Sequence, residues 1–144
     1  MLAVDTNVLI YAANADSPFH APCRSQLERW RRDPSPTFLT WNVCYEFLKN
    51  ATHSRVFPRP WQVEPAMQFL QALLASPGFA LLTATPRHEA VLAQTLAELP
   101  ELRGGVLHDL HTAVLMREHG VSQICTNDRD FHRFPFLTVI DPLE

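Results

Sequence analysis

Short apolar runs alternate with longer amphipathic segments along this chain, and this alternation constrains the possible folds more than any other feature of the sequence. The apolar runs are too short for helices and are bounded by turn residues, which is typical of buried strands. Because parallel strands are joined by crossovers, usually helices, the alternation predicts an α/β fold with a mainly parallel central sheet flanked by helices. Strands are predicted at residues 2–4, 38–39, 79–82, 123–126 and 137–140, and helices at residues 7–13, 21–32, 41–52, 63–75, 87–99 and 107–119.

Apolar side chains recur at helical spacing in the longer segments, and this spacing identifies the residues that face the core. Cys23, Leu27 and Trp30 share one side of the second predicted helix. Thr40 directly precedes the third helix and is suited to cap its N-terminus. By the same spacing argument, we expect Trp41 and most of the phenylalanines to lie in the core.

The composition agrees with one compact domain spanning residues 1–144. The chain has 144 residues, of which 47% are hydrophobic and 19% charged, which excludes a disordered or collagen-like chain. Its 4 glycines are too few and too scattered for a G-x-G-x-x-G or a Walker A loop. Nucleotide-binding folds that depend on those loops are therefore excluded.

The cysteines and the apolar runs indicate a cytoplasmic protein with no membrane segment. Cys23, Cys44 and Cys125 are odd in number, distant in sequence and without C-x-x-C spacing, so we expect them to be buried thiols in a reducing compartment. No basic segment followed by an apolar one marks a signal peptide, and no apolar run approaches the roughly 18 residues of a membrane span.

Four acidic residues are placed where a parallel sheet would bring them together. Asp5 directly follows the first predicted strand, and Asp128 lies in the turn after the fourth. Glu46 lies in the helix that follows the second strand, and Asp109 in the opening turn of the last helix. Carboxylates at one sheet edge would repel one another unless a divalent cation lay among them. A set of oxygen ligands without cysteine or histidine suits Mg²⁺ or Mn²⁺.

Each acid also has a purely structural interpretation, so the prediction of a site depends on their joint placement. The alternatives are a helix N-cap for Asp5, an exposed ion pair with Lys49 for Glu46, a helix-dipole interaction for Asp109, and Asx turns for Asp128 and Asp130.

These acids stand in four ordered motifs that resemble a known family. The motifs are Val4-Asp5-Thr6-Asn7 near the start, Glu46 in its helix, His108-Asp109, and Thr126-Asn-Asp128-Arg-Asp130 near the end. In this order they resemble the motifs of PIN-domain ribonucleases, and most closely those of the VapC toxins of bacterial toxin–antitoxin pairs. The resemblance covers essentially the whole chain and implies a PIN-like three-layer sandwich.

The resemblance implies a metal-dependent endoribonuclease that hydrolyses RNA phosphodiester bonds by attack of water, leaving 5′-phosphate and 3′-hydroxyl ends. It further implies a cognate antitoxin as partner and a homodimer, for which the apolar helical stretches at residues 7–13 and 63–75 are candidate surfaces. We expect the antitoxin to insert an arginine among the acids and to lay an apolar segment near Trp41 and Trp61. The implied roles are catalysis for Asp5, Glu46, Asp109 and Asp128, metal binding for Asp5, Asp109 and Asp128, and support for Thr6, Asn7, Thr126 and Asp130.

Other functions remain open at this stage. His108 and His111 could act as a metal-free acid–base pair, or bind zinc together with His132. The fold could also serve as a catalytically inactive RNA- or protein-binding PIN module. A metal-dependent phosphatase is a further alternative, although the aspartyl-nucleophile type would need a second Asp where Asn7 stands.

A proline-punctuated loop offers a candidate contact to RNA. All bases of the chain except Lys49 are arginine, and the guanidinium forks of Arg55 and Arg59 suit phosphate. Phe57 and Trp61 beside them could stack on an unpaired base. Alternatively, these aromatic residues fill the core and tether the loop.

Overall fold

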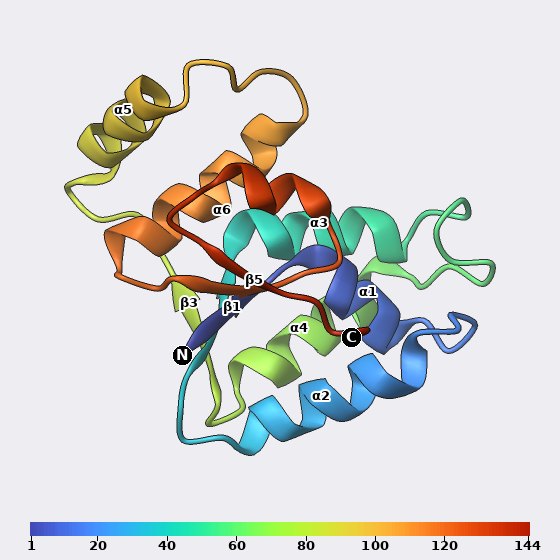
Figure 1. The fold of residues 1–144 in the computed structure, drawn as a ribbon. Coiled ribbons are helices and arrows are strands. Elements are labelled where there is room, and N and C mark those ends of the chain that lie inside the picture. The colour runs from blue at the N-terminus through green and yellow to red at the C-terminus, as the bar shows by residue number, and fades with distance from the viewer.

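A five-stranded sheet in the order β3-β2-β1-β4-β5 forms the centre of the computed structural model, which describes all of residues 1–144 (Figure 1). All four strand pairs are parallel, so the predicted α/β fold is confirmed. The chain winds outward from β1 in both directions, which makes the carboxyl end of β1 a switch point of strand order, where ligands bind in open α/β sheets. The strands are β1 (Leu2–Val4), β2 (Thr37–Thr40), β3 (Phe79–Leu82), β4 (Gln123–Cys125) and β5 (Thr138–Ile140).

The six predicted helices are all present, with ends within one residue of the predicted ones. The turn after β4 additionally contains one short 3₁₀ helix, which the sequence pattern did not predict. None of the helices combines the length and apolarity that crossing a bilayer requires. The helices are α1 (Thr6–Ala13), α2 (His20–Arg32), α3 (Trp41–Ala51), α4 (Val63–Leu74), α5 (His88–Glu98), α6 (Val106–Glu118) and the 3₁₀ helix η1 (Arg129–Arg133).

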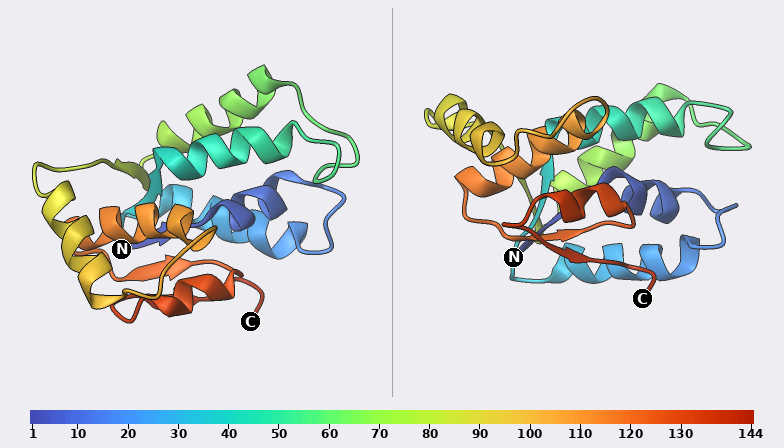
Figure 2. Two further views of the ribbon diagram at one scale, coloured as in Figure 1. Left: turned by 90° about the horizontal axis from the view of Figure 1, so that it is seen from above. Right: turned by 45° about the horizontal axis from the view of Figure 1, so that its top comes forward.

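Two hydrophobic cores separate the sheet from the helices on its two faces, which makes the three layers seen in Figure 2. Successive strand residues point to opposite faces: in β1, Val4 packs with α1 to α4, and Ala3 packs with α6 and η1. In β4, Cys125 lies in the same core as Val4, and Ile124 lies in the same core as Ala3. The three free cysteines are buried, as predicted.

Trp41 does not lie in the core, contrary to the prediction. Its side chain is 44% exposed, whereas Trp30 is buried as expected. The buried stripe of α3 is centred on Val43, Phe47 and Ala51, and Trp41 lies to one side of it. Helical spacing therefore predicted the buried face of α3 correctly but did not exclude Trp41 from it.

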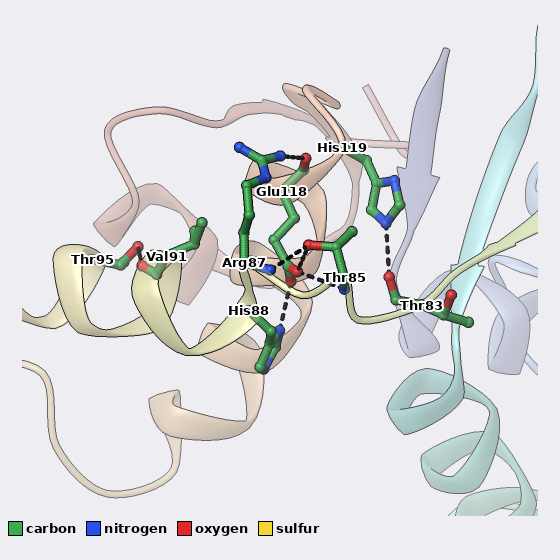
Figure 3. A network of polar contacts seen from close by, with 8 residues as sticks. All are labelled: Thr83, Thr85, Arg87, His88, Val91, Thr95, Glu118 and His119. Carbon is green, nitrogen blue, oxygen red and sulfur yellow. Dashed lines mark hydrogen bonds and ion pairs between the residues drawn. The ribbon is translucent and has the colours of Figure 1, made fainter.

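A polar network at the end of α6 fastens the start of α5 (Figure 3). The buried Glu118 side chain accepts hydrogen bonds from the Thr85 backbone N–H at 2.8 Å and the Thr85 hydroxyl at 2.6 Å. It also pairs with Nδ1 of His88 at 2.6 Å, and Arg87 donates to its backbone carbonyl. Thr95 is the only fully buried residue of α5, and Val91 and Leu92 pack partly buried against the core, so the network adds polar contacts to an apolar attachment.

Glu118→Gln is expected to destabilise the protein by about 1–3 kcal/mol at pH 7 in urea denaturation. Burial alone would raise the pKa of Glu118, but the hydrogen bonds from Thr85 and His88 outweigh it and hold the pKa below its usual value. Because the folded-state pKa is lowered, this stability is present above the unfolded pKa of about 4.3 and is lost as the pH falls below it. The difference between the two proteins should therefore shrink below pH 4. Glu98→Gln, at an exposed ion pair with Arg117, is the control and should cost under about 1 kcal/mol.

Candidate active site

The four predicted acids line one cavity at the carboxyl edge of the sheet. The cavity has a volume of about 320 Å³, is open to solvent, and is lined by Asp5 after β1 and by residues from α1, α3, α6, the loop between α3 and α4, and the turn after β4. No lysine, arginine or histidine lines it. The lining residues are Asp5, Thr6, Asn7, Ile10, Tyr11, Glu46, Asn50, Val56, Asp109 and Asp128.

Asp5 is both a helix cap and a wall of the cavity, so its two interpretations are compatible. It follows β1 directly and is only 6% exposed. One carboxylate oxygen accepts a hydrogen bond from the Thr6 backbone N–H at 2.8 Å, which caps α1. The other oxygen accepts from Asn7 Nδ2 at 3.0 Å and from the Thr126 hydroxyl at 2.7 Å. These contacts hold the carboxylate in a fixed orientation at the switch point.

Glu46 is held toward the same cavity from α3. The hydroxyl of Thr6 donates to Glu46 Oε2 at 3.1 Å, joining α3 to the first turn of α1. Lys49 forms no ion pair with Glu46, so the exposed i,i+3 pair considered above is not present.

Asp109 and Asp128 form a tight cluster with Asp130, in which one carboxylate oxygen from each residue lies within 4.8 Å of the other two. Asp128 accepts a hydrogen bond from the backbone N–H of Asp130 at 2.9 Å, so the Asx turn is present as well. Its own N–H donates to the Thr126 hydroxyl at 2.9 Å. The Asp109 carboxylate accepts no hydrogen bond from any protein group, which leaves both of its oxygens available to a ligand.

The acids resist being ionised together. Burial, with the nearby charges of Glu46 and Asp128, raises the pKa of Asp5 to about 6 despite the hydrogen bonds from Thr126 and Thr6. Burial and the charges of the neighbouring acids raise the pKa of Asp109 to about 7. Because the cavity contains no basic side chain, it needs positive charge from elsewhere at neutral pH. This donor set of carboxylate oxygens fits a hard divalent cation.

The histidines named in the two alternatives lie outside the lining of the acidic cavity. His111 lies edge-on to His88, with ring centroids 5.8 Å apart, and neither His108 nor His111 lines the acidic cavity. The one group of three side chains positioned to hold a metal is the aspartate cluster, and it includes no histidine. A zinc site with His132 is therefore not supported.

The structure places Arg55 and Arg59 away from the lining of the acidic cavity. Arg59 forms an exposed ion pair with Asp16 at 2.8 Å, and Val56, beside Arg55, reaches the cavity instead. Phe57 is buried, and Trp61 packs against it with ring centroids 5.7 Å apart. The core interpretation is confirmed for Phe57, whereas Trp61 is half-buried and packs against the edge of the core.

The structure shows a hydrogen bond between α3 and α6 that the sequence did not predict. Asn42 Nδ2 donates to the Thr112 hydroxyl at 2.7 Å and joins α3 to α6. Asn42 lies one turn before Glu46, and Thr112 lies one turn after Asp109, so the bond braces the two helices that carry these acids. The polar stripe of Asn42, Glu46 and Asn50 at four-residue spacing was the available signal.

Thr112→Val is expected to lower the free energy of unfolding by about 1–3 kcal/mol, because it leaves the Asn42 amide without its partner. Oδ1 of Asn42 is already buried without a hydrogen-bond partner, so the amide has no alternative contact in place. Thr112→Ser keeps the hydroxyl and should recover at least half of the loss. Urea denaturation measures both. A valine variant as stable as the wild type would show that the hydrogen bond contributes nothing to the free energy of unfolding.

Comparison with known proteins assigns the family. The PIN domain family model matches residues 2–137. Ribonuclease VapC43 of Mycobacterium tuberculosis is 35% identical over 144 residues, covering 100% of this chain and 97% of the relative. Ribonuclease VapC48 of the same species is 29% identical over 138 residues, covering 96% and 94%.

Solved structures show the same fold. VapBC2 from Rickettsia felis, bound to a promoter DNA fragment, superposes with a TM-score of 0.69 at 17% identity, covering 96% of both chains. VapC20 of Mycobacterium tuberculosis, described as a toxin that cleaves the sarcin-ricin loop, superposes with a TM-score of 0.61 at 18% identity, covering 92% of this chain and 93% of the other. The chain therefore belongs to the PIN-domain family and is a relative of the VapC ribonucleases.

Proposed function

We propose that this protein is a Mg²⁺- or Mn²⁺-dependent endoribonuclease and the toxin of a toxin–antitoxin pair, acting in the cytoplasm. The observation that carries the proposal is the convergence of Asp5, Glu46, Asp109 and Asp128 in one cavity that holds no basic residue. The ribonuclease names of the relatives support the reaction class.

In this proposal the residues divide the chemistry between them. Asp109 and Asp128 would hold the cation together with Asp5, which lines the same cavity but is not part of the tight aspartate cluster, and Asp130 of that cluster would add charge beside them. A bound Mg²⁺ or Mn²⁺ supplies Lewis acidity that activates water and neutralises charge on the phosphoryl oxygens. Glu46 has one oxygen bonded to Thr6, and its other oxygen, Oε1, orients the attacking water and accepts its proton. The side-chain amide of Asn7 donates hydrogen bonds to Asp5 and to Thr126, and it fixes the orientation of the Asp5 carboxylate.

The test is cleavage of unpaired RNA by the purified protein with and without Mg²⁺ or Mn²⁺. We expect cleavage only with the metal, complete loss in excess EDTA, and 5′-phosphate and 3′-hydroxyl ends. Cleavage that persists in EDTA, or 2′,3′-cyclic phosphate ends, would favour a histidine mechanism instead. RNA binding without cleavage, with or without metal, would favour a catalytically inactive PIN module. Release of phosphate from phosphate monoesters, without RNA cleavage, would favour a phosphatase.

We also propose a cognate antitoxin, which the structural neighbours solved as VapBC support. An arginine inserted among the acids would take the place of the cation, and an apolar segment would occupy the hollow of about 410 Å³ lined by Trp61, Pro65 and Phe69 together with Gln68. Affinity for the antitoxin should therefore fall as Mg²⁺ is added. Affinity that is independent of Mg²⁺ would place inhibition outside the acidic cavity.

A homodimer is the remaining part of the proposal, and the structure narrows its candidate surface. Val8, Leu9 and Ile10 of α1 are buried within the chain, so the apolar face of α1 is not available to a second copy. Tyr45 on α3 is 71% exposed and Trp41 is 44% exposed, beside a small apolar hollow shared with α4. Sedimentation should give a dimer for the wild type and a monomer for Tyr45→Arg. A wild-type monomer would refute the dimer.

A further inference from the structure

The acidic cavity has a second, chemically different end. On α1, Thr6 and Asn7 border the acids, and Ile10 and Tyr11 follow one turn later. On α3, Asn50 follows one turn after Glu46 and contributes an amide to the lining. Both helices therefore lead from the acids to residues without charge within a single cavity.

A loop residue and an aromatic pair complete this uncharged end. Val56, from the loop between α3 and α4, lines the cavity and is 37% exposed. The half-buried ring of Tyr11 packs edge-on against Phe19, with ring centroids 5.1 Å apart and an interplanar angle of 67°. The loops that carry Val56 and Phe19 extend from the same end of the molecule and are joined by the Arg59–Asp16 ion pair (Figure 1).

We propose that this uncharged end, formed by Ile10, Tyr11, Val56 and Asn50, is a subsite for the base of the nucleotide next to the scissile phosphate. This inference rests on the proposed function, because the acids and their cation place the phosphate at the other end of the cavity. A nucleobase has apolar faces and polar edges. Its faces match the Tyr11 ring and the Val56 side chain, and its edges match the Asn50 amide.

The dimensions and the chemistry favour a base over other occupants. A volume of about 320 Å³ lies at the lower end of the range of small-ligand sites, so the cavity has room for about one nucleotide unit. Ribose joins each base to its phosphate. A nucleotide whose phosphate lies at the acidic end can therefore place its base at the uncharged end. A base paired within a duplex is not free to enter. The subsite therefore makes the enzyme selective for unpaired RNA.

Binding of fluorescein-labelled RNA octamers tests the subsite. The measurement uses Glu46→Gln with Mn²⁺, because this background keeps Asp5, Asp109 and Asp128 while removing the group that accepts the proton. Adding Tyr11→Leu, which keeps the apolar bulk but removes the stacking face, should weaken binding of a mixed-sequence octamer about 10-fold in anisotropy titrations. Tyr11→Phe keeps the ring and should bind as the background does. Leu96→Ala, at an exposed apolar residue on α5 outside the cavity, is the control and should also leave binding unchanged.

An octamer of the same length with abasic ribose units separates stacking from general damage to the site. The Glu46→Gln background should bind the abasic strand about 10-fold more weakly than the normal strand, and Tyr11→Leu should cause no further loss. Equal losses on both strands, or none on either, would overturn the base subsite. The proposed function is judged separately, by metal-dependent cleavage with the wild-type protein, so the two failures are distinguishable.

Discussion

Asp109→Asn is expected to reduce RNA cleavage by about 10²-fold or more while making the metal-free protein more stable. The loss of activity follows from removing one carboxylate of the proposed cation site, since such a cation contributes several kcal/mol of transition-state stabilisation. The gain in stability follows from the raised pKa of Asp109, which burial and the charges of Asp5, Asp128, Asp130 and Glu46 bring to about 7. An asparagine at this position has no charge, so it is not repelled by the neighbouring acids. After allowance for solvent screening, we expect a gain of about 1 kcal/mol at pH 8.

Asp5→Asn is the informative comparison, because Asp5 accepts three hydrogen bonds where Asp109 accepts none. An amide has only one oxygen, so the substitution disturbs either the cap of α1 or the contacts to Asn7 and Thr126. We expect the same loss of cleavage but lower stability than Asp109→Asn shows. Thermal unfolding in EDTA, together with initial cleavage rates in Mn²⁺, measures both effects. Asp109→Asn with wild-type activity would remove Asp109 from the site.

Saturating Mn²⁺ is expected to stabilise the protein strongly at pH 8 and much less at pH 5. The folded-state pKa values of Asp5 and Asp109, about 6 and about 7, lie above the usual aspartate value of 3.8, so the native state holds more protons than the unfolded state between about pH 4 and pH 7. The metal-free free energy of unfolding therefore falls as the pH rises through this window. A cation that binds only the deprotonated native site adds about 2.7 kcal/mol at one hundred times its dissociation constant.

Thermal unfolding at pH 5 and pH 8, with Mn²⁺ or with EDTA, checks this expectation. Asp16→Asn, at an acid outside the cavity whose partner is Arg59, is the control and should retain the full response to Mn²⁺. Asp109→Asn should lose most of it. A Mn²⁺ response of equal size at both pH values, or an undiminished response in Asp109→Asn, would place the bound ion elsewhere.

The alternation of apolar runs and helical patterns predicted all the α-helices and all the strands, because each of these elements leaves a pattern in the local sequence. The convergence of Asp5, Glu46, Asp109 and Asp128 was also accessible, since the carboxyl ends of parallel strands and the helices that begin there meet at one edge. The short helix η1 was not accessible, because five residues after an Asx turn carry too little periodic signal to be distinguished from the turn itself.

By itself, the amino-acid sequence determined the α/β architecture and the set of acids at one sheet edge, because both follow from local patterns and from a general property of parallel sheets. Only the tertiary structure decided that Asp5 caps a helix and lines the cavity at once, that Trp41 is exposed, and that Tyr11 and Val56 meet at the uncharged end. These outcomes depend on which elements pack together, because Asp5 and Glu46 are 41 positions apart along the chain and Tyr11 and Val56 are 45 apart. Such contacts form only when the whole chain is folded.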